Sequence, residues 1–405
     1  MWQADILPRM TKYDCIVVGL GAMGSATTYQ LAKAGAKVLG IDQFSPPHKL
    51  GSSHGGSRIT RSAIGEGVEY SELALRSHTI WREVEAATGR QLFLRNGCLT
   101  ISGTDAVVMH DVDDFFANIG AAARQYDIPH RMFETPEAIR ARYPQFAVKA
   151  GDHGILDEEA GTLFPETCVA AQLELAERHG AAILRNTAVA SIDGADVTTA
   201  DGQRFSAEKV VIAAGAWLPR FAAEELAKHF TVTRQVLLWF EIKTNPERFA
   251  PENCPVYIWQ LPRNAHVHSS IYGFAHDGDP SHGVKVTHEE SGGVADPNHV
   301  DRTVDQAEEI DRVYRNYIEP FLPDLGPHCL RTETCLYTRV DRSRFVIDTD
   351  PRNDRVIFVS ACSGHGFKHS AAIGEAVAQQ VTNGRAAHVD IAPFKLARLA
   401  DYLKA

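Results

Sequence analysis

A short apolar run followed at once by three spaced glycines constrains this chain more than any other feature of its sequence. Residues 13–18 predict a buried parallel strand, and residues 23–34 predict the helix that follows it. Between them, Gly19, Gly21 and Gly24 predict a tight turn in which the backbone comes close to a pyrophosphate at the helix N-terminus. The sequence therefore predicts a dinucleotide-binding βαβ unit.

A second strand supports this prediction. Residues 37–41 are mostly apolar, and Asp42 follows them directly. An acidic residue at this distance from the glycine turn hydrogen-bonds a ribose hydroxyl of the dinucleotide. The strand, the helix and the acid together make the glycine pattern a much more specific signal than it is alone.

Bulk properties narrow the class of protein. At 405 residues we expect two domains. A net charge of −10 disfavours nucleic acid and anionic membrane as partners, and no apolar run approaches a membrane span. Seven dispersed cysteines and the lack of a visible secretory signal predict a cytoplasmic protein. His328, Cys329 and Cys335 match no common zinc spacing, so we expect no metal.

The predicted elements place the nucleotide fold in separate parts of the chain. Helices are expected over 70–87 and 166–179, and strands over 182–184, 188–192, 197–200, 209–214, 236–242, 344–348 and 355–360. Another glycine motif, residues 363–368, follows the last of these strands. The return of nucleotide-fold strands near the C-terminus favours FAD over a nicotinamide as the cofactor. We expect an α/β protein with an FAD-binding Rossmann-like domain of glutathione-reductase type, into which an antiparallel-sheet substrate domain is inserted.

The expected boundaries follow from these elements. The FAD-binding domain is discontinuous and comprises residues 1–92, 160–230 and 336–405. The substrate domain comprises residues 93–159 and 231–335.

Several motifs resemble those of monomeric sarcosine oxidase and N-methyltryptophan oxidase, which are FAD-containing amine oxidases of the D-amino-acid-oxidase superfamily. They lie at residues 46–48, 51–61, 65–67, 73–77, 215–217, 272–274, 283–285, 335–338 and 363–368. The resemblance covers nearly the whole chain from about residue 13. It implies a secondary-amine oxidase that forms an imine and reduces dioxygen to hydrogen peroxide.

The resemblance also implies roles for single residues. Cys335 occupies the position that carries FAD through a thioether, and Lys285 matches the lysine at which dioxygen is reduced. Arg61 and Lys368 match the pair that binds the substrate carboxylate. The implied catalytic residues are Lys285, Arg58, His54 and Tyr272, and the implied substrate-binding residues are Arg61, Lys368, Tyr337 and Tyr272.

The same comparison gives the residues expected to contact FAD. They come from both glycine motifs and from the segments between them. The full set is Gly19, Gly21, Ala22, Met23, Gly24, Asp42, Gln43, Ser52, His54, Arg58, Val189, Gly215, Trp217, Cys335, Gly364, His365, Gly366, Phe367 and Lys368.

For these residues physical chemistry also allows ordinary structural roles as alternatives to the functional ones. Arg58 and Arg61 would share one face of a helical turn and bind a carboxylate, or they form an ordinary ion-pairing cluster. Cys335 is either the flavin attachment point or a buried inert thiol. Lys285 stabilises negative charge during oxygen reduction or is simply solvated. His365 is interpreted as a loop-packing residue of a motif whose backbone N–H groups meet the flavin.

Two positions depart from the family. Ile64 stands where a tyrosine is common, and Glu289 stands where a cavity histidine is expected, with His288 one place earlier. The substrate pocket therefore differs from that of a sarcosine enzyme. N-methyl amino acids, cyclic imino acids and sugar-modified amino acids all remain open as substrates.

The expected partners are a small amine and dioxygen, and the expected assembly is a monomer. Two other functions fit the same motifs. One is a flavin-dependent amine dehydrogenase that uses another electron acceptor. The other is a flavin-binding protein without turnover.

Overall fold

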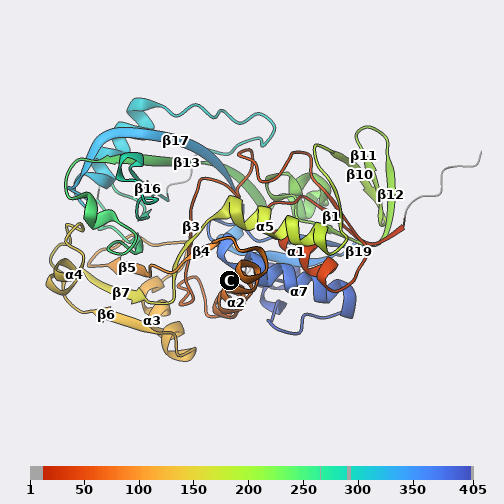
Figure 1. Cartoon of the computed structure of the whole chain (residues 1–405), viewed down its shortest axis with the longest axis horizontal. Coiled ribbons are helices and arrows are strands. Elements are labelled where there is room, and N and C mark those ends of the chain that lie inside the picture. The colour runs from red at the N-terminus through yellow and green to blue at the C-terminus, as the bar shows by residue number, and fades with distance from the viewer. Residues whose placement is uncertain (1–11, 265, 290–292, 403–405) are drawn as a thin grey trace, which may run out of the picture.

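Two large β-sheets organise the chain. The computed structural model describes residues 12–264, 266–289 and 293–402. In Figure 1 the first sheet lies at the right with most of the long helices beside it, and the second lies at the left. A third, smaller sheet has three strands.

The first sheet has a parallel centre. Its central strands run in the order β9-β2-β1-β12-β19, and β18 and the β10-β11 hairpin add antiparallel edges. The strand bounds are β1 Lys12–Val18, β2 Val38–Ile41, β9 Ala182–Leu184, β10 Val189–Asp193, β11 Asp196–Thr199, β12 Arg204–Ile212, β18 Val346–Asp350 and β19 Asn353–Ser360. The central strands are buried on both faces, which explains their continuous apolar sequences.

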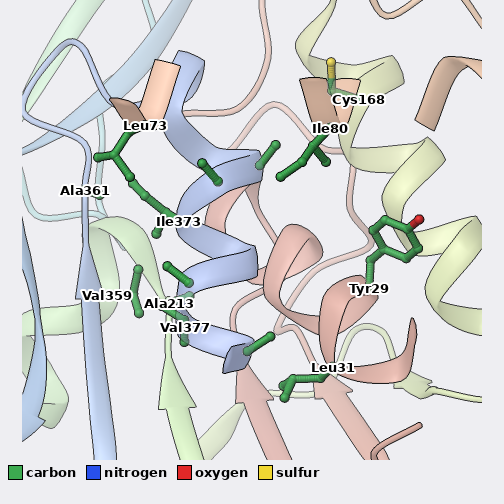
Figure 2. Close-up of a cluster of buried hydrophobic side chains, with 14 of the residues drawn as sticks. Tyr29, Leu31, Leu73, Ile80, Cys168, Ala213, Val359, Ala361, Ile373 and Val377 are labelled. Carbon is green, nitrogen blue, oxygen red and sulfur yellow. The ribbon is translucent and has the colours of Figure 1, made fainter. Parts of the chain in front are cut away.

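Helices cover one face of this sheet. They are α1 Ala22–Lys33, α2 Glu69–Thr88, α5 Pro165–Arg178 and α7 Ser370–Asn383. Figure 2 shows Ile373 and Val377, which are one helical turn apart on α7, between the strand side and α1. A Cβ at Gly374 would lie 2.4 Å from that of Ala26, so glycine lets α7 approach α1 closely. This packing fixes the N-terminus of α1 against the sheet.

The second sheet is antiparallel except for one parallel pair. Its order is β17-β13-β16-β15-β14-β5-β7-β6, in which β14 and β5 run parallel. Its strands are β5 Cys98–Ser102, β6 His130–Phe133, β7 His153–Asp157, β13 Phe230–Ile242, β14 Val256–Trp259, β15 Ile271–Gly273, β16 Val284–His288 and β17 Leu325–Val340.

The remaining elements are short. The third sheet consists of β3 Arg58–Thr60, β8 Gly161–Leu163 and β4 Phe93–Leu94. The other helices are α3 Phe115–Gln125, α4 Pro136–Arg142, α6 Glu224–Ala227 and α8 Leu396–Tyr402. No helix in the described part of the chain has both the length and the apolar character that a bilayer crossing requires.

Most predicted elements agree with the structure to within a few residues, but one local prediction is wrong. Arg58 and Arg61 do not share a helical turn, because Arg58 begins strand β3 and Arg61 follows its end. The two side chains therefore lack the shared face that a helical turn would give them, although both line the same cavity. The division into domains stays a prediction, and its boundary at residues 335 and 336 falls inside β17.

Candidate functional site

The glycine turn after β1 is too crowded for side chains. Gly19 has φ +88°, and a Cβ there would lie 2.6 Å from the carbonyl oxygen of Ala213. A Cβ at Gly24 would lie 1.7 Å from the carbonyl oxygen of Gly19. Helix α1 begins after Gly21, which offers no side-chain cap. The α1 N-terminus is therefore a compact anion-binding end.

Asp42 is fixed at the end of β2. Its carboxylate accepts hydrogen bonds from the backbone N–H of Leu20 at 2.7 Å and of Phe44 at 2.8 Å. Burial raises the pKa of Asp42, although these two amides and His48 oppose the shift. Each carboxylate oxygen still has acceptor capacity, so the residue fits a ribose hydroxyl as donor.

One cavity runs from this turn to the second sheet. Predicted site residues that line it come from both glycine motifs, from the loop before β3 and from β15 and β17. They are Gly19, Gly21, Ala22, Met23, Asp42, Gln43, Ser52, Arg58, Arg61, Val189, Gly215, Trp217, Tyr272, Cys335, Tyr337, Gly364, His365, Gly366, Phe367 and Lys368. Three predicted site residues, Gly24, His54 and Lys285, lie outside its lining.

Lys285 on β16 lies behind the loop that precedes β3. Its Nζ donates to the carbonyl oxygens of Gly55 at 2.9 Å and Ser57 at 2.7 Å. Burial and the nearby Arg58 lower the pKa of Lys285 well below its usual value. The two carbonyls and the ring of Phe274, 4.3 Å from Nζ, favour the charged form. The Lys285 amine is thus held at a fixed interior position.

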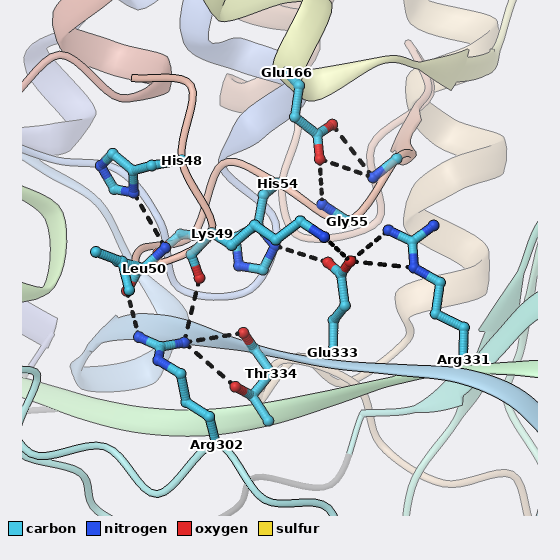
Figure 3. Close-up of polar contacts among 12 residues, drawn as sticks. His48, Lys49, Leu50, His54, Gly55, Glu166, Arg302, Arg331, Glu333 and Thr334 are labelled. Carbon is cyan, nitrogen blue, oxygen red and sulfur yellow. Dashed lines mark hydrogen bonds and ion pairs between the residues drawn. The ribbon is translucent and has the colours of Figure 1, made fainter. Parts of the chain in front are cut away.

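Glu333 on β17 contacts side chains of the loop that precedes β3, as Figure 3 shows. It accepts hydrogen bonds from Lys49 at 2.7 Å and from Arg331, and it lies 3.1 Å from Nδ1 of the fully buried His54. Burial alone would raise the pKa of Glu333, but the bonds from His54, Lys49 and Arg331 hold it well below its usual range. His54 is therefore held by a carboxylate two residues before Cys335.

Five ionisable residues form a charged cluster at the other end of the cavity: Arg61, Glu66, His110, Glu289 and Lys368. Arg61 donates to both oxygens of Glu66 at 2.8 Å, and Lys368 Nζ lies 3.9 Å from Glu66. His110 Nδ1 lies 3.1 Å from Glu66, and its Nε2 lies 2.5 Å from Glu289. Arg61 and Lys368 are thus brought together, with a carboxylate of the chain between them.

Burial and mutual charge set the ionisation of this cluster. Burial lowers the pKa of Lys368 to about 8. Burial also opposes charge on His110, but Glu289 and Glu66 outweigh it and raise its pKa to about 9. Burial would raise the pKa of Glu66, yet Arg61 and Lys368 hold it well below its usual range. The folded protein therefore favours the charged forms of His110 and Glu66.

Cys335 and Tyr337 project from β17 into the cavity. The thiol is free and 1% exposed, and burial raises its pKa while Arg58 opposes the shift. Gly364 has φ +85°, and a Cβ there would lie 3.1 Å from the Tyr337 ring. The C-terminal glycine motif therefore packs directly on this tyrosine.

The two departures from the family have different positions. Ile64 is fully buried in the helix-side core, away from the cavity lining. Glu289 lines the cavity, whereas the His288 ring packs against Tyr317 at 4.9 Å. Only the Glu289 replacement therefore changes the wall of the cavity.

Sequence reasoning assigned no role to Glu66, His110 or Glu333. Glu66 lies within the motif at residues 65–67, but neither its position nor that of Glu333 signals a partner. His110 lies in a loop between β5 and α3, where no periodicity indicates its direction.

Comparisons with known proteins agree with this geometry. Residues 14–380 match the family described as FAD dependent oxidoreductase. The chain is 37% identical to monomeric sarcosine oxidase of Streptomyces avermitilis, over 96% of this chain and 98% of that protein. It is 34% identical to N-methyl-L-tryptophan oxidase of Yersinia pestis, over 95% and 99%.

A solved structure shares the fold. It is the open form of NikD, described as an unusual amino acid oxidase essential for nikkomycin biosynthesis. The TM-score is 0.79 at 22% identity, and the match covers 95% of this chain and 97% of that one.

Proposed function

The chain belongs to the FAD dependent oxidoreductase family, and from this premise we propose that it is an oxidase of secondary-amine amino acids. It oxidises the C–N bond to an imine and passes the electrons to dioxygen, which becomes hydrogen peroxide. N-methyl and cyclic amino acids are the proposed substrate classes, and the first class is in line with the activities named for its relatives.

The charged cluster is the observation that carries this proposal. Arg61 and Lys368 both lie against the buried carboxylate of Glu66, and both line the cavity. Arg61 offers a planar guanidinium for a substrate carboxylate, and Lys368 offers a compact second cation. The cavity thus favours an amino acid over a simple amine.

The residues at the other end fit FAD. The crowded glycine turn and the N-terminus of α1 suit a pyrophosphate, and Asp42 suits a ribose hydroxyl. Cys335 has no disulfide partner and faces the cavity, which supports a thioether to the cofactor. We assign covalent attachment to this residue.

The cofactor supplies the acceptor for a hydride equivalent and the reaction with dioxygen. The chain's own residues bind and orient. Arg61 and Lys368 hold the carboxylate, and Tyr272 and Tyr337 wall the cavity beside it. The substrate amine must be neutral for oxidation. Lys285 is fixed behind the loop of Arg58, where its protonated form would stabilise the negative charge that develops as dioxygen is reduced.

A substrate panel tests the function. Purified holoprotein is mixed without oxygen with N-methyl amino acids, cyclic amino acids and their decarboxylated amines, and bleaching of the flavin absorbance is recorded. Oxygen is then admitted and peroxide is measured. We expect bleaching by amino acids and stoichiometric peroxide. Bleaching without peroxide identifies a dehydrogenase, and no bleaching by any amine overturns the proposal.

A further inference from the structure

Glu289 is an acidic residue of the cavity wall. It stands where the resemblance to the family implies a histidine, and it is separate from Arg61 and Lys368, the pair that we call the carboxylate clamp. Its side chain is 16% exposed and lines the cavity together with Tyr272, Tyr337 and Lys368. One oxygen of Glu289 would lie 3.5 Å from a Cβ placed on Gly364. The carboxylate therefore lies near the C-terminal glycine motif.

Two contacts hold this carboxylate in place. Its Oε1 lies 2.5 Å from His110 Nε2, and its Oε2 accepts a hydrogen bond of 3.2 Å from the Ser270 hydroxyl. Each oxygen uses one partner, and a carboxylate oxygen can accept more than one hydrogen bond. Glu289 thus keeps acceptor capacity on the cavity side.

His110 keeps Glu289 ionised. His110 Nε2 lies 2.5 Å from Glu289, whereas Nδ1 lies 3.1 Å from Glu66 without forming a hydrogen bond to it. Both carboxylates favour the protonated imidazolium and raise the pKa of His110 to about 9. The resulting imidazolium stabilises negative charge on Glu289, and the pKa of Glu289 is lowered although burial opposes this. The cavity wall consequently offers an anion with a fixed position.

We propose that Glu289 is a specificity-determining residue, which selects amino acids bearing an ammonium or N–H group in addition to the carboxylate and the oxidised amine. This inference rests on the proposed function. A purely apolar side chain would remove water from the free acceptor sites of Glu289 without replacing their hydrogen bonds. A donor group of the substrate replaces them and gains a charged hydrogen bond.

A matched ligand pair tests the proposal. Nα-methyl-L-lysine and N-methyl-L-norleucine have similar length and shape and differ in the terminal ammonium. Their dissociation constants are measured in the anaerobic holoprotein by stopped-flow absorbance, from the rapid change in the flavin spectrum that precedes bleaching. Hydrogen bonds to charged groups predict that the lysine derivative binds about tenfold or more tightly.

Variants separate recognition from structure. Glu289→Gln should reduce the preference to about twofold or less, Glu289→Asp should retain part of it, and Glu252→Gln, an exposed carboxylate change, should leave it intact. An equal preference in the unmutated protein and Glu289→Gln would overturn the inference, as would failure of both ligands to bind. Binding with the expected preference but no oxidation of either ligand would instead contradict the proposed function.

Discussion

The guanidinium of Arg61 donates two hydrogen bonds of 2.8 Å to the carboxylate of Glu66. The cation that the sequence assigned to substrate thus carries a carboxylate of the chain itself. Both side chains are almost fully buried, so the pair lies in a low-dielectric region where charges interact strongly. A substrate carboxylate must therefore share Arg61 with Glu66.

Replacing Arg61 should damage recognition of amino acids selectively. Loss of one partner of a buried charged interaction costs a few kcal/mol, so Arg61→Ala should raise the KM for an N-methyl amino acid about a hundredfold. Turnover of the decarboxylated amine, already poor, should change little. Steady-state oxygen consumption with both compounds checks this, and the amine controls for damage from leaving Glu66 unpaired. Equal turnover of both compounds by the unmutated enzyme contradicts the carboxylate clamp.

Cys335 should hold the cofactor covalently. Acid precipitation of the holoprotein should leave the yellow colour in the pellet, because a thioether survives denaturation. Cys335→Ser should release the colour to the supernatant, while Cys362→Ser, a second cavity-lining thiol, should not. Absorbance spectra of pellet and supernatant give the result. Colour found wholly in the supernatant of the unmutated protein contradicts the linkage but not FAD binding.

Local sequence signals predicted the nucleotide half of the fold well. The glycine turn, the strands and helices α1, α2 and α5 are specified by residues close together in the chain, such as Gly19 with Gly24. The charged cluster is different, because its members come from positions 61, 66, 110, 289 and 368. Their proximity depends on how two sheets and a loop pack, which no periodicity encodes.

The wrong prediction has the same origin. A spacing of three suggests a shared helical face, but it carries that meaning only if the segment is helical. Pairing of β3 with β8 makes residues 58–60 a strand, and this pairing joins segments about a hundred residues apart. The resemblance to a family supplied Arg61 and Lys368 as a pair. It supplied neither Glu66 between them nor His110.

Lys285 should affect the reaction with oxygen more than the reaction with amine. A preorganised charge contributes a few kcal/mol, so Lys285→Met should slow reoxidation of the reduced protein about a hundredfold or more. Reduction by substrate without oxygen should change only severalfold, since Lys285 does not line the cavity. Lys285→Arg keeps the charge and should be affected less. Stopped-flow absorbance separates the two half-reactions, and a collapse of reduction with normal reoxidation makes Lys285 a substrate residue.

His110 should give the protein a pH-dependent stability. Its pKa is raised from 6.5 to about 9 by Glu289 and Glu66 against the effect of burial, so the folded state binds more protons than the unfolded state between these values. The contribution is therefore fully present below pH 6.5 and is lost as the pH rises through 9. Its size should be on the order of a few kcal/mol.

The contribution of Lys368 to stability changes with pH in the opposite direction to that of His110. The measurement must therefore compare two proteins that both contain Lys368. Burial lowers its pKa from 10.5 to about 8, so its contribution increases as the pH rises from 8 to 10.5. Denaturant unfolding of the unmutated protein and His110→Gln at pH 6 and pH 9.5 isolates the histidine, because both proteins contain Lys368. We expect the stability difference between them to shrink at pH 9.5. A difference independent of pH would mean that His110 does not carry the charge that bridges Glu66 and Glu289.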